Sequence, residues 1–455
     1  MAMHGADIAQ LRSLAAQFDR AADQLETCRM AVGGSVRSSP WQGADAVRFR
    51  ADWDSAHAGR IAAAASLLRT GAQGLRNNAD QQEQASAVDG GAGSGFAGVT
   101  ASARGGNPTI PPPGTDPEQV SDWWNSLTPS QQRALIENDP LTIGNLNGVP
   151  IEDRTAANQL TAEGRLAEVD QELDKLGDRP QPNPWIPDPT GMGYVTQLKL
   201  WQEKHDALLA EKGYLEAVAR GDRSLVVYDP AGERIVEMLG TPGPGTKEVI
   251  TYLPGTGANM AGFYEGSTQQ VANFLVQADG SNSTVAFVYK DGPWASWLPW
   301  ESTSNINPIH AAKEGVQLAQ FQQALALEGD FTGAQWNGMA HSAGMTSLSA
   351  SERAGAHYDQ VLSLGGAMLF PGWEADPNTG YQHFQYGLDA INFANPIGDL
   401  PVESGAFSNH VFMPEVHRFL GVPYLDPLES HVRVASGPDL NRPALNAMFG
   451  VIHSD

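Results

Sequence analysis

The chain has 455 residues, with 52 acidic and 28 basic side chains and a formal net charge of −24 at pH 7. This length allows a large core together with an accessory module. The acidic balance argues against nucleic acid or an anionic membrane surface as a partner bound through charge. Cys28 is the only cysteine, which excludes an intrachain disulfide and a cysteine-based metal site.

The N-terminus has no basic segment followed by an apolar one, so we expect no Sec-type signal peptide. The chain also has no uncharged apolar run of about 20 residues. We therefore expect no transmembrane segment.

Residues 1–87 are predicted to form a hairpin of two helices. Apolar side chains recur at spacings of three and four over residues 8–25, and at roughly helical spacing over residues 47–75. The connection between them contains Trp41 and Gly43, in the tripeptide Trp-Gln-Gly. A helical hairpin with this tripeptide resembles the WXG100 family of secreted actinobacterial and firmicute proteins.

The WXG100 resemblance implies export through a type VII secretion system, with a cytoplasmic stage before the protein is secreted or reaches the cell surface. It also implies a WXG100-type helical partner for the hairpin. The family's export signal often includes a tyrosine followed four residues later by an acidic residue. Because no tyrosine occurs in the first 190 residues, a partner chain carries that signal or the signal is absent.

The composition changes over residues 88–118, where glycines and then prolines replace apolar residues. Such a segment has too little apolar content to fold, so we expect a linker. Residues 119–222 are predicted to be a helical preamble to the next module. Its longest helices are expected from about Thr155 and from about Thr196 to Ala219.

From residue 223 to residue 455 the pattern alternates between strands and helices. A predicted antiparallel hairpin over residues 225–238 comes first. It is followed by predicted strands at 249–253, 285–289, 336–339, 361–364 and 384–388, and by helices at 267–277, 310–327, 343–354 and 442–449. This order indicates the α/β class, with a mostly parallel sheet covered by helices, as in the α/β-hydrolase fold.

The pentad Ala340-His341-Ser342-Ala343-Gly344 lies between a predicted strand and a predicted helix. A serine at a sharp strand-to-helix turn is the nucleophile elbow of α/β-hydrolases. Small neighbours are needed because the chain passes very close to itself at this turn. Ala340 stands where the motif usually has glycine. The alternative interpretation of Ser342 is an ordinary helix N-cap.

A serine hydrolase also needs a carboxylate and a histidine, in the chain order serine, acid, histidine. Asp389 follows the predicted strand at 384–388 and is the favoured acid, with Asp399 as the alternative. His431 lies in a predicted loop before the last helix and is the favoured base, with His410 as the alternative. We expect Ser342, His431 and Asp389 to lie within hydrogen-bonding reach of one another.

The oxyanion of such a reaction is held by backbone N–H groups. One is expected from Ala343, directly after the nucleophile. The other is expected from Thr256 or Gly257, in the glycine-containing loop that follows the predicted strand at 249–253. The histidines are scattered and none is paired with a carboxylate at helical spacing, so we expect no metal and no cofactor.

Three segments occur together and in order: Ile143–Pro150, Tyr252–Gly257 and Ala340–Gly344. Together they resemble the actinobacterial α/β-hydrolase family first catalogued as DUF1023, over residues 120–452. The resemblance implies Ser342, Asp389 and His431 as the catalytic triad. It also places Asp291 at an acidic position near the site. The family usually has a proline after the acid, where this chain has alanine.

The apolar, aromatic segment Trp294–Trp300 has two interpretations: a loop packed on the helical preamble, or one wall of an acyl-binding cleft. The sequence as a whole predicts a serine hydrolase that cleaves a small-molecule or lipid ester of apolar character. Two alternatives remain. One is an inactive secreted effector or scaffold that keeps the hydrolase fold. The other is an antibacterial phospholipase-type toxin.

Overall fold

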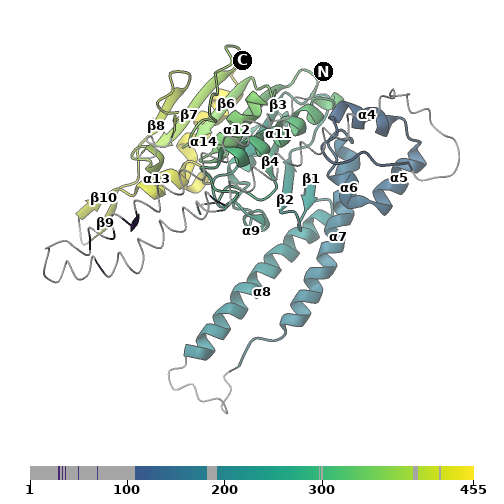
Figure 1. Cartoon of the computed structure of the whole chain (residues 1–455), viewed down its shortest axis with the longest axis horizontal. Coiled ribbons are helices and arrows are strands. Elements are labelled where there is room, and N and C mark those ends of the chain that lie inside the picture. Colours follow the sequence, from purple (N-terminus) through teal and green to yellow (C-terminus); the bar gives the residue numbers. More distant parts are fainter. Residues whose placement is uncertain are drawn as a thin grey trace. The chain divides into compact units, whose positions relative to one another are not determined.

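The computed structural model describes residues 108–181, 192–296, 298, 301–392, 398–419 and 422–454, together with six positions before residue 108. The chain divides after Gly106 into two compact units. Apart from these six positions, the predicted hairpin over 1–87, including Trp41 and Gly43, lies outside the described residues. The second unit, Asn107–Asp455, carries the sheet and the helices around it (Figure 1).

Within the described residues, eight strands form one sheet in the order β1-β2-β4-β3-β5-β6-β7-β8. The pairs β1–β2 and β2–β4 are antiparallel, and the other five pairs, from β4–β3 to β7–β8, are parallel. This is the α/β-hydrolase arrangement that the sequence predicted. The strands are β1 (Ser224–Asp229), β2 (Arg234–Leu239), β3 (Glu248–Leu253), β4 (Thr284–Asp291), β5 (Gln335–His341), β6 (Gln360–Leu364), β7 (Gly380–Tyr386) and β8 (Ser408–Phe412).

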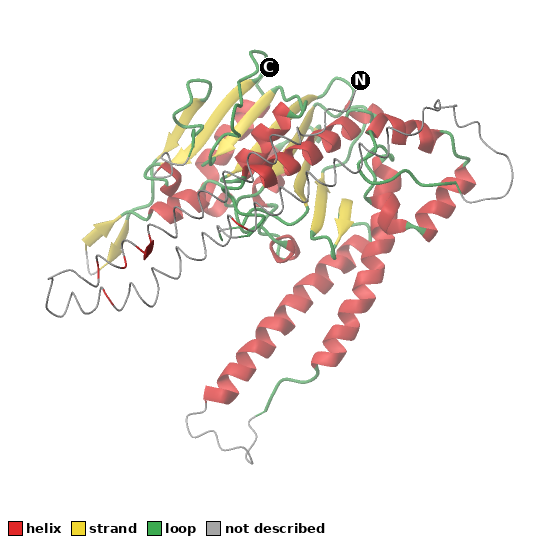
Figure 2. Cartoon of the chain, viewed as in Figure 1, coloured by secondary structure: helices red, strands yellow, loops and turns green. Residues whose placement is uncertain are grey.

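The central strands are buried on both faces, because helices cover the sheet from each side (Figure 2). Successive residues of β3 enter different apolar clusters: Val249 packs in one and Ile250 in the other. The first cluster joins the sheet to α11 (Pro308–Leu325) and α12 (Gly344–Arg353). The second cluster includes side chains from α7 (Ile151–Leu176), α8 (Met192–Ala219), α10 (Gln270–Ala278) and α14 (Pro438–Ile452). Such double burial explains why these strands are nearly continuous apolar runs.

The helices follow the strands as in βα units. Beside α11 and α12 they are α9 (Met260–Tyr264), α10 (Gln270–Ala278), α13 (Pro427–Arg433) and α14 (Pro438–Ile452), with a short 3₁₀ helix at Gly329–Phe331. The helical preamble consists of α4 (Pro117–Asn125), α5 (Pro129–Asn138), α6 (Pro140–Gly144), α7 (Ile151–Leu176) and α8 (Met192–Ala219). In the described residues, no helix is both long enough and apolar enough to cross a membrane.

The preamble is joined to the sheet by the segment Ile143–Pro150. The side chain of Asn145 donates to the carbonyl of Tyr228 (2.9 Å) and accepts from its N–H (3.1 Å). Tyr228 lies in β1, which is an edge strand, so this amide occupies backbone groups that would otherwise be unpaired. Gly148 has a φ of +104°, and a Cβ there would lie 2.2 Å from the Pro117 carbonyl oxygen. The motif is therefore a structural connection between preamble and sheet.

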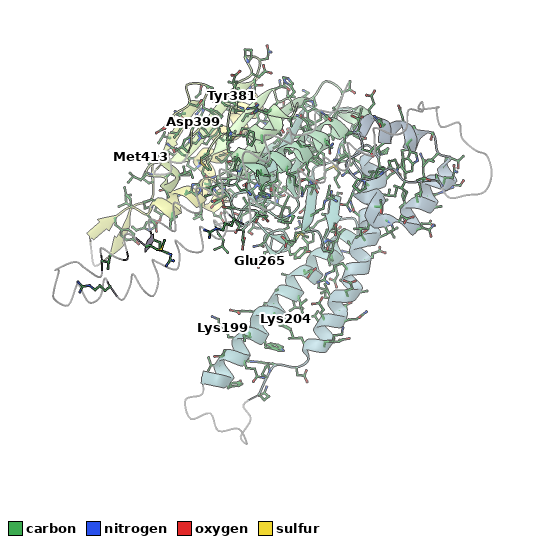
Figure 3. All side chains as sticks on the ribbon, in the orientation of Figure 1. Lys199, Lys204, Glu265, Tyr381, Asp399 and Met413 are labelled. Atoms are coloured by element: carbon green, nitrogen blue, oxygen red, sulfur yellow. The ribbon has the colours of Figure 1, made fainter. Side chains whose placement is uncertain are left out.

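Helices α7 and α8 pack against each other as a long antiparallel pair (Figures 1 and 2). Near the sheet, Arg165 of α7 makes a forked ion pair with Glu211 of α8, with N–O distances of 2.8 and 3.1 Å. Further along α8, charged side chains such as Lys199 and Lys204 project into solvent (Figure 3). The pair is thus held by contacts between its own helices and presents a charged surface.

The sequence did not predict several elements after residue 400. These are the edge strand β8, the hairpin of β9 (His417–Phe419) and β10 (Val422–Tyr424), and the short helix α13. The side chains of β8 are exposed or half-buried, and α13 has only two buried residues, so both lack the apolar periodicity that identifies buried elements. The sequence did not predict these elements because they are stabilised by pairing with distant segments, which leaves no local pattern.

Candidate active site

The segment around Ser342 forms a sharp turn between β5 and α12. Ser342 has a φ of +50°, a left-handed conformation that is uncommon for a residue other than glycine. Its N–H donates to the carbonyl of Leu364 (3.1 Å), and its carbonyl accepts from Ala367 (2.8 Å). Two hydrogen bonds to neighbouring segments therefore hold the strained backbone in place.

Close approach of the chain explains the small residues at this turn. A Cβ on Gly344 would lie 2.6 Å from the carbonyl oxygen of Pro254. A Cβ on Gly255 would lie 2.6 Å from His341 Nδ1 and 3.1 Å from Ser342 Cβ. The loop after β3 and the turn after β5 thus touch through glycines on both sides.

Ala340, where the motif usually has glycine, is fully buried within an apolar cluster of the core. It pairs with Leu253 of β3 on one side and Ser363 of β6 on the other. Its methyl group packs inside the protein, so alanine is compatible with the turn in this chain.

The structure brings Ser342, His431 and Asp389 together in one hydrogen-bonded row. The distance from Ser342 Oγ to His431 Nε2 is 2.9 Å, and that from His431 Nδ1 to Asp389 Oδ1 is 2.8 Å. All three residues are buried, Asp389 completely. This is the arrangement in which an imidazole can take a proton from a serine hydroxyl while a carboxylate orients it.

His431 lies in helix α13 and not in a loop, which corrects the prediction. The helix begins after Asp426, whose carboxylate accepts from the N–H groups of Leu428 and Glu429, and Pro427 occupies its first position. The sequence contains this capping signal, but the helix is only seven residues long. The Ser430 N–H donates to the Asp426 carbonyl (3.0 Å), so the residue before His431 is part of a hydrogen-bonded helical turn.

Asp389 lies in the turn that follows β7. Its Oδ1 also accepts from the N–H of Ile391 (2.9 Å), a hydrogen bond that closes the turn without a proline at position 390. Leu388, just before it, has a φ of +60°. Gly365 passes so close that a Cβ there would lie 2.7 Å from Asp389 Oδ2 and 3.2 Å from His431 Nδ1. Sequence reasoning missed this glycine.

The two alternative residues lie elsewhere. His410 is in β8, where its Nε2 is 2.8 Å from Gln382 Oε1 and its ring stacks on Phe384. Asp399 is exposed, and its backbone carbonyl accepts from Leu369 (Figure 3). Neither makes a hydrogen bond to His431.

His341 is a further histidine at the site. Its Nε2 is 3.2 Å from the backbone oxygen of His431, and the two rings are 5.0 Å apart. Burial, together with the neighbouring His431, lowers the pKa of His341 to about 3. The ring is therefore neutral at ordinary pH, with Nε2 protonated as the donor and Nδ1 left as an acceptor.

The backbone N–H groups beside Ser342 differ in availability. The N–H of Gly257 donates to the carbonyl of Ala295 (2.7 Å), so it cannot serve as an oxyanion donor without breaking that bond. In the described part of the chain, nothing accepts from the N–H of Thr256 or of Ala343. Of the predicted donors, Thr256 and Ala343 are therefore available.

Trp294 braces the loop that carries Thr256. The indole N–H of Trp294 donates to the Pro254 carbonyl (3.1 Å), and its ring is buried against Tyr289. Asn305 also reaches the Thr256 hydroxyl (3.4 Å). Trp294 is thus a buried support for the loop. Residues 297, 299 and 300 of the aromatic segment lie outside the described residues.

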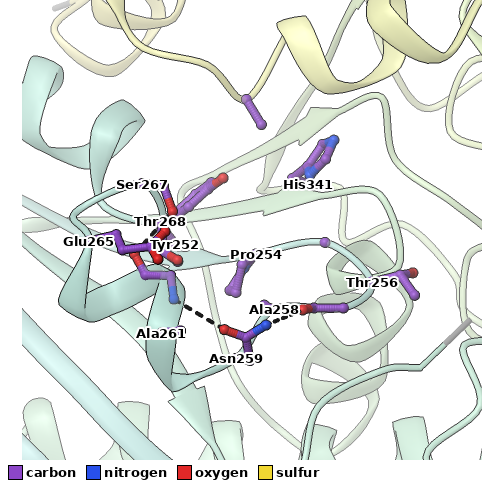
Figure 4. Close-up of a pocket in the computed structure, with 14 residues that line it drawn as sticks. Tyr252, Pro254, Thr256, Ala258, Asn259, Ala261, Glu265, Ser267, Thr268 and His341 are labelled. Carbon is purple, nitrogen blue, oxygen red and sulfur yellow. Dashed lines mark hydrogen bonds between the residues drawn. The ribbon is translucent and has the colours of Figure 1, made fainter. Parts of the chain in front are cut away.

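A cavity of about 470 Å³ opens beside the site (Figure 4). His341 and Gly255 form part of its wall, and both are in contact with the Ser342 turn. Ala435, four residues after His431, lines it as well. A molecule in this cavity would therefore contact His341 and the loop after β3, which adjoin Ser342 in the fold.

Asp291 lies outside this hydrogen-bonded row. It ends β4 and pairs with Arg234 of β2 at 2.5 Å. The part of the chain that the structure describes contains no group of three or more His, Cys, Asp or Glu residues placed to hold a metal ion.

Comparison with known proteins gives distant similarities. No family model matches the chain. Two uncharacterized proteins of Mycobacterium tuberculosis, MT2140 of strain CDC 1551 and Rv2079 of strain H37Rv, are each 28% identical over 286 residues. The match covers 56% of this chain and 40% of each relative, so the chain spans about two fifths of their length.

Solved structures with similarity to the chain include dienelactone hydrolase from Anabaena variabilis (14% identity, TM-score 0.27) and TT1662 from Thermus thermophilus (14%, 0.28). A dienelactone hydrolase-like promiscuous phosphotriesterase, P91, from metagenomic libraries is 13% identical with a TM-score of 0.31. They cover 48%, 49% and 50% of this chain and 90%, 95% and 95% of their own chains. At this distance they carry no argument about activity.

Proposed function

We propose that the protein is a serine hydrolase that cleaves carboxylic esters. The observation that carries the proposal is the row from Ser342 Oγ through His431 to Asp389, with distances of 2.9 and 2.8 Å. Two features add support: the left-handed backbone of Ser342 and the free N–H groups beside it. Structural serines rarely combine a strained turn with a buried imidazole and carboxylate.

In the first half of the reaction, Ser342 Oγ attacks the ester carbonyl carbon and passes its proton to His431 Nε2. The N–H groups of Ala343 and Thr256 hold the negative oxygen of the tetrahedral intermediate. As the intermediate collapses, the bond to the alcohol oxygen breaks, and His431 gives its proton to the departing alcohol. An acyl-serine remains.

In the second half, His431 takes a proton from water, and the resulting nucleophile attacks the acyl-serine. The acid leaves when the bond to Ser342 Oγ breaks, and the proton returns to that oxygen. Asp389 accepts from His431 Nδ1 throughout, which holds the imidazole in the tautomer whose Nε2 faces the serine.

Labelling with a fluorophosphonate probe tests the proposal. The intact protein should be labelled, and Ser342→Ala should lose all labelling. Ser347→Ala is the matched control, because Ser347 lies one turn further along α12 and its hydroxyl bonds to Glu314 without a histidine between them. If folded protein is not labelled, the chain is the inactive scaffold. If Ser342→Ala keeps its labelling, Ser342 is not the nucleophile and the proposed assignment is wrong.

We also propose, from the sequence resemblances alone, that the hydrolase belongs with the DUF1023 family and is exported by type VII secretion through the hairpin over 1–87. Trp41→Ala should then keep the protein out of the culture filtrate without lowering its level in cells. Equal export of both forms would contradict this role. Toxicity that a neighbouring immunity gene relieves would instead favour the phospholipase-type toxin.

A further inference from the structure

The cavity beside Ser342 is lined by polar side chains, although the sequence predicted an apolar ester. Tyr252, Glu265, Ser267 and Thr268 lie together on one side of it, and Thr256 lies on another (Figure 4). Hydroxyl groups dominate this set. Each hydroxyl can both donate and accept a hydrogen bond.

Tyr252 is the most informative of these residues. It is only 3% exposed, yet its hydroxyl makes no hydrogen bond to any described residue. Burial raises the pKa of Tyr252, so the phenol stays protonated and keeps its donor. Buried phenol groups normally have a partner, and here the cavity is where one can be bound.

Glu265 and Thr268 complete the polar wall. In the described residues neither side chain has a hydrogen-bond partner, and Glu265 is exposed at the edge of the cavity. A carboxylate accepts hydrogen bonds only, so it suits the hydroxyl groups of a ligand. An alkyl group here would leave the Tyr252 hydroxyl unpaired, at a cost in binding free energy.

The cavity lies on the histidine side of the proposed reaction. His341 bonds to the backbone of His431, and Ala435 follows His431 by four residues; both line the cavity. The leaving alcohol must be within reach of His431 Nε2, which protonates it. A leaving alcohol that extends from His431 towards His341 and Ala435 would enter this cavity.

We propose that this cavity binds a leaving alcohol with several hydroxyl groups, such as a glycerol or sugar unit, in the ester that Ser342 cleaves. This inference rests on the proposed hydrolase function. Tyr252 donates to one hydroxyl of the alcohol, while Glu265 and Thr268 accept from others. Here specificity depends on hydrogen bonds that an alkyl ester cannot make.

The test compares esters with the same acyl chain: glycerol monobutyrate, butyl butyrate and p-nitrophenyl butyrate. We expect kcat/KM for the glycerol ester to exceed that for butyl butyrate by at least about ten-fold. Tyr252→Phe should reduce this ratio about ten-fold, and Glu265→Gln about three-fold. Fluorophosphonate labelling of each variant shows that the protein is folded and that Ser342 is still reactive.

Two control variants match these changes outside the cavity. Tyr358→Phe removes the hydroxyl of a buried tyrosine that bonds to Ser351, and Glu137→Gln neutralises an exposed carboxylate on α5. Both should leave the ratio unchanged. Equal rates for the glycerol and butyl esters, or equal effects of Tyr252→Phe and Tyr358→Phe, would overturn the inference. With labelling of Ser342 intact, that result would leave the hydrolase function standing.

Discussion

Replacing Asp389 by asparagine removes one negative charge from the candidate site and almost no volume. The charge matters only when His431 becomes positive, which happens in the transition state. Two unit charges about 4 Å apart interact by about 4 kcal/mol at an effective dielectric constant of 20. Because each tenfold change in rate corresponds to about 1.4 kcal/mol, the loss is about a thousand-fold. If the imidazole of His431 also adopted the wrong tautomer, the loss in rate would rise to about 10⁴-fold.

The assay is Ser342-dependent hydrolysis of p-nitrophenyl butyrate, with urea unfolding measured on the same samples. Asp389→Asn should unfold at a similar urea concentration, because the buried carboxylate oxygen Oδ2 has no partner among the described residues. Asp399→Asn is the matched control and should keep full activity, since Asp399 is exposed and away from the row. A loss below about ten-fold for Asp389→Asn, or a comparable loss for Asp399→Asn, would refute the assignment of the acid.

Three further outcomes are expected. Gly365→Ala places a methyl group 2.7 Å from Asp389 Oδ2 at a φ of +50°, so kcat should fall at least about ten-fold; unchanged kcat would show that the turn can shift. Asn145→Ala leaves both backbone groups of Tyr228 unpaired, so urea unfolding should show a loss of about 1–3 kcal/mol; no loss would mean that water replaces the amide. Burial raises the pKa of Glu352 to about 7, so the native state retains a proton that the unfolded chain has lost. The free energy of unfolding should therefore fall as pH rises from about 4.5 to about 7, and Glu352→Gln should flatten that slope; an equal slope in the variant would assign it to other groups.

Local sequence pattern predicted two kinds of element: strands that are buried on both faces, and the turn whose close packing requires small residues. The strands of the central sheet were predicted as apolar runs, and the turn at Ser342 from the small residues around it. Both signals arise from contacts within a few residues or from complete burial. The edge strand β8 has neither property. The helix of His431 has a capping signal but only seven residues, so neither element was predicted.

The choice among chemically equivalent residues needed the tertiary structure. Position after a strand and before the last helix favoured Asp389 and His431 over Asp399 and His410. His431 lies 89 residues from Ser342 and 42 from Asp389, so only packing shows that the three meet. The availability of Thr256 depends on Ala295, which lies in a different loop and occupies the N–H of Gly257. Such assignments follow from how distant segments pack against one another.

The sequence by itself determined that a serine stands at a strand-to-helix turn in an α/β fold, because turn sterics and strand burial are written in neighbouring residues. Only the tertiary structure decided which acid and base reach Ser342, that Ala340 fits where glycine is usual, and that the adjoining cavity is polar. The cavity joins Tyr252 of β3, Glu265 after α9 and Ala435 after α13. The cavity is polar because these separate segments pack together, so its polarity cannot be read from any one of them.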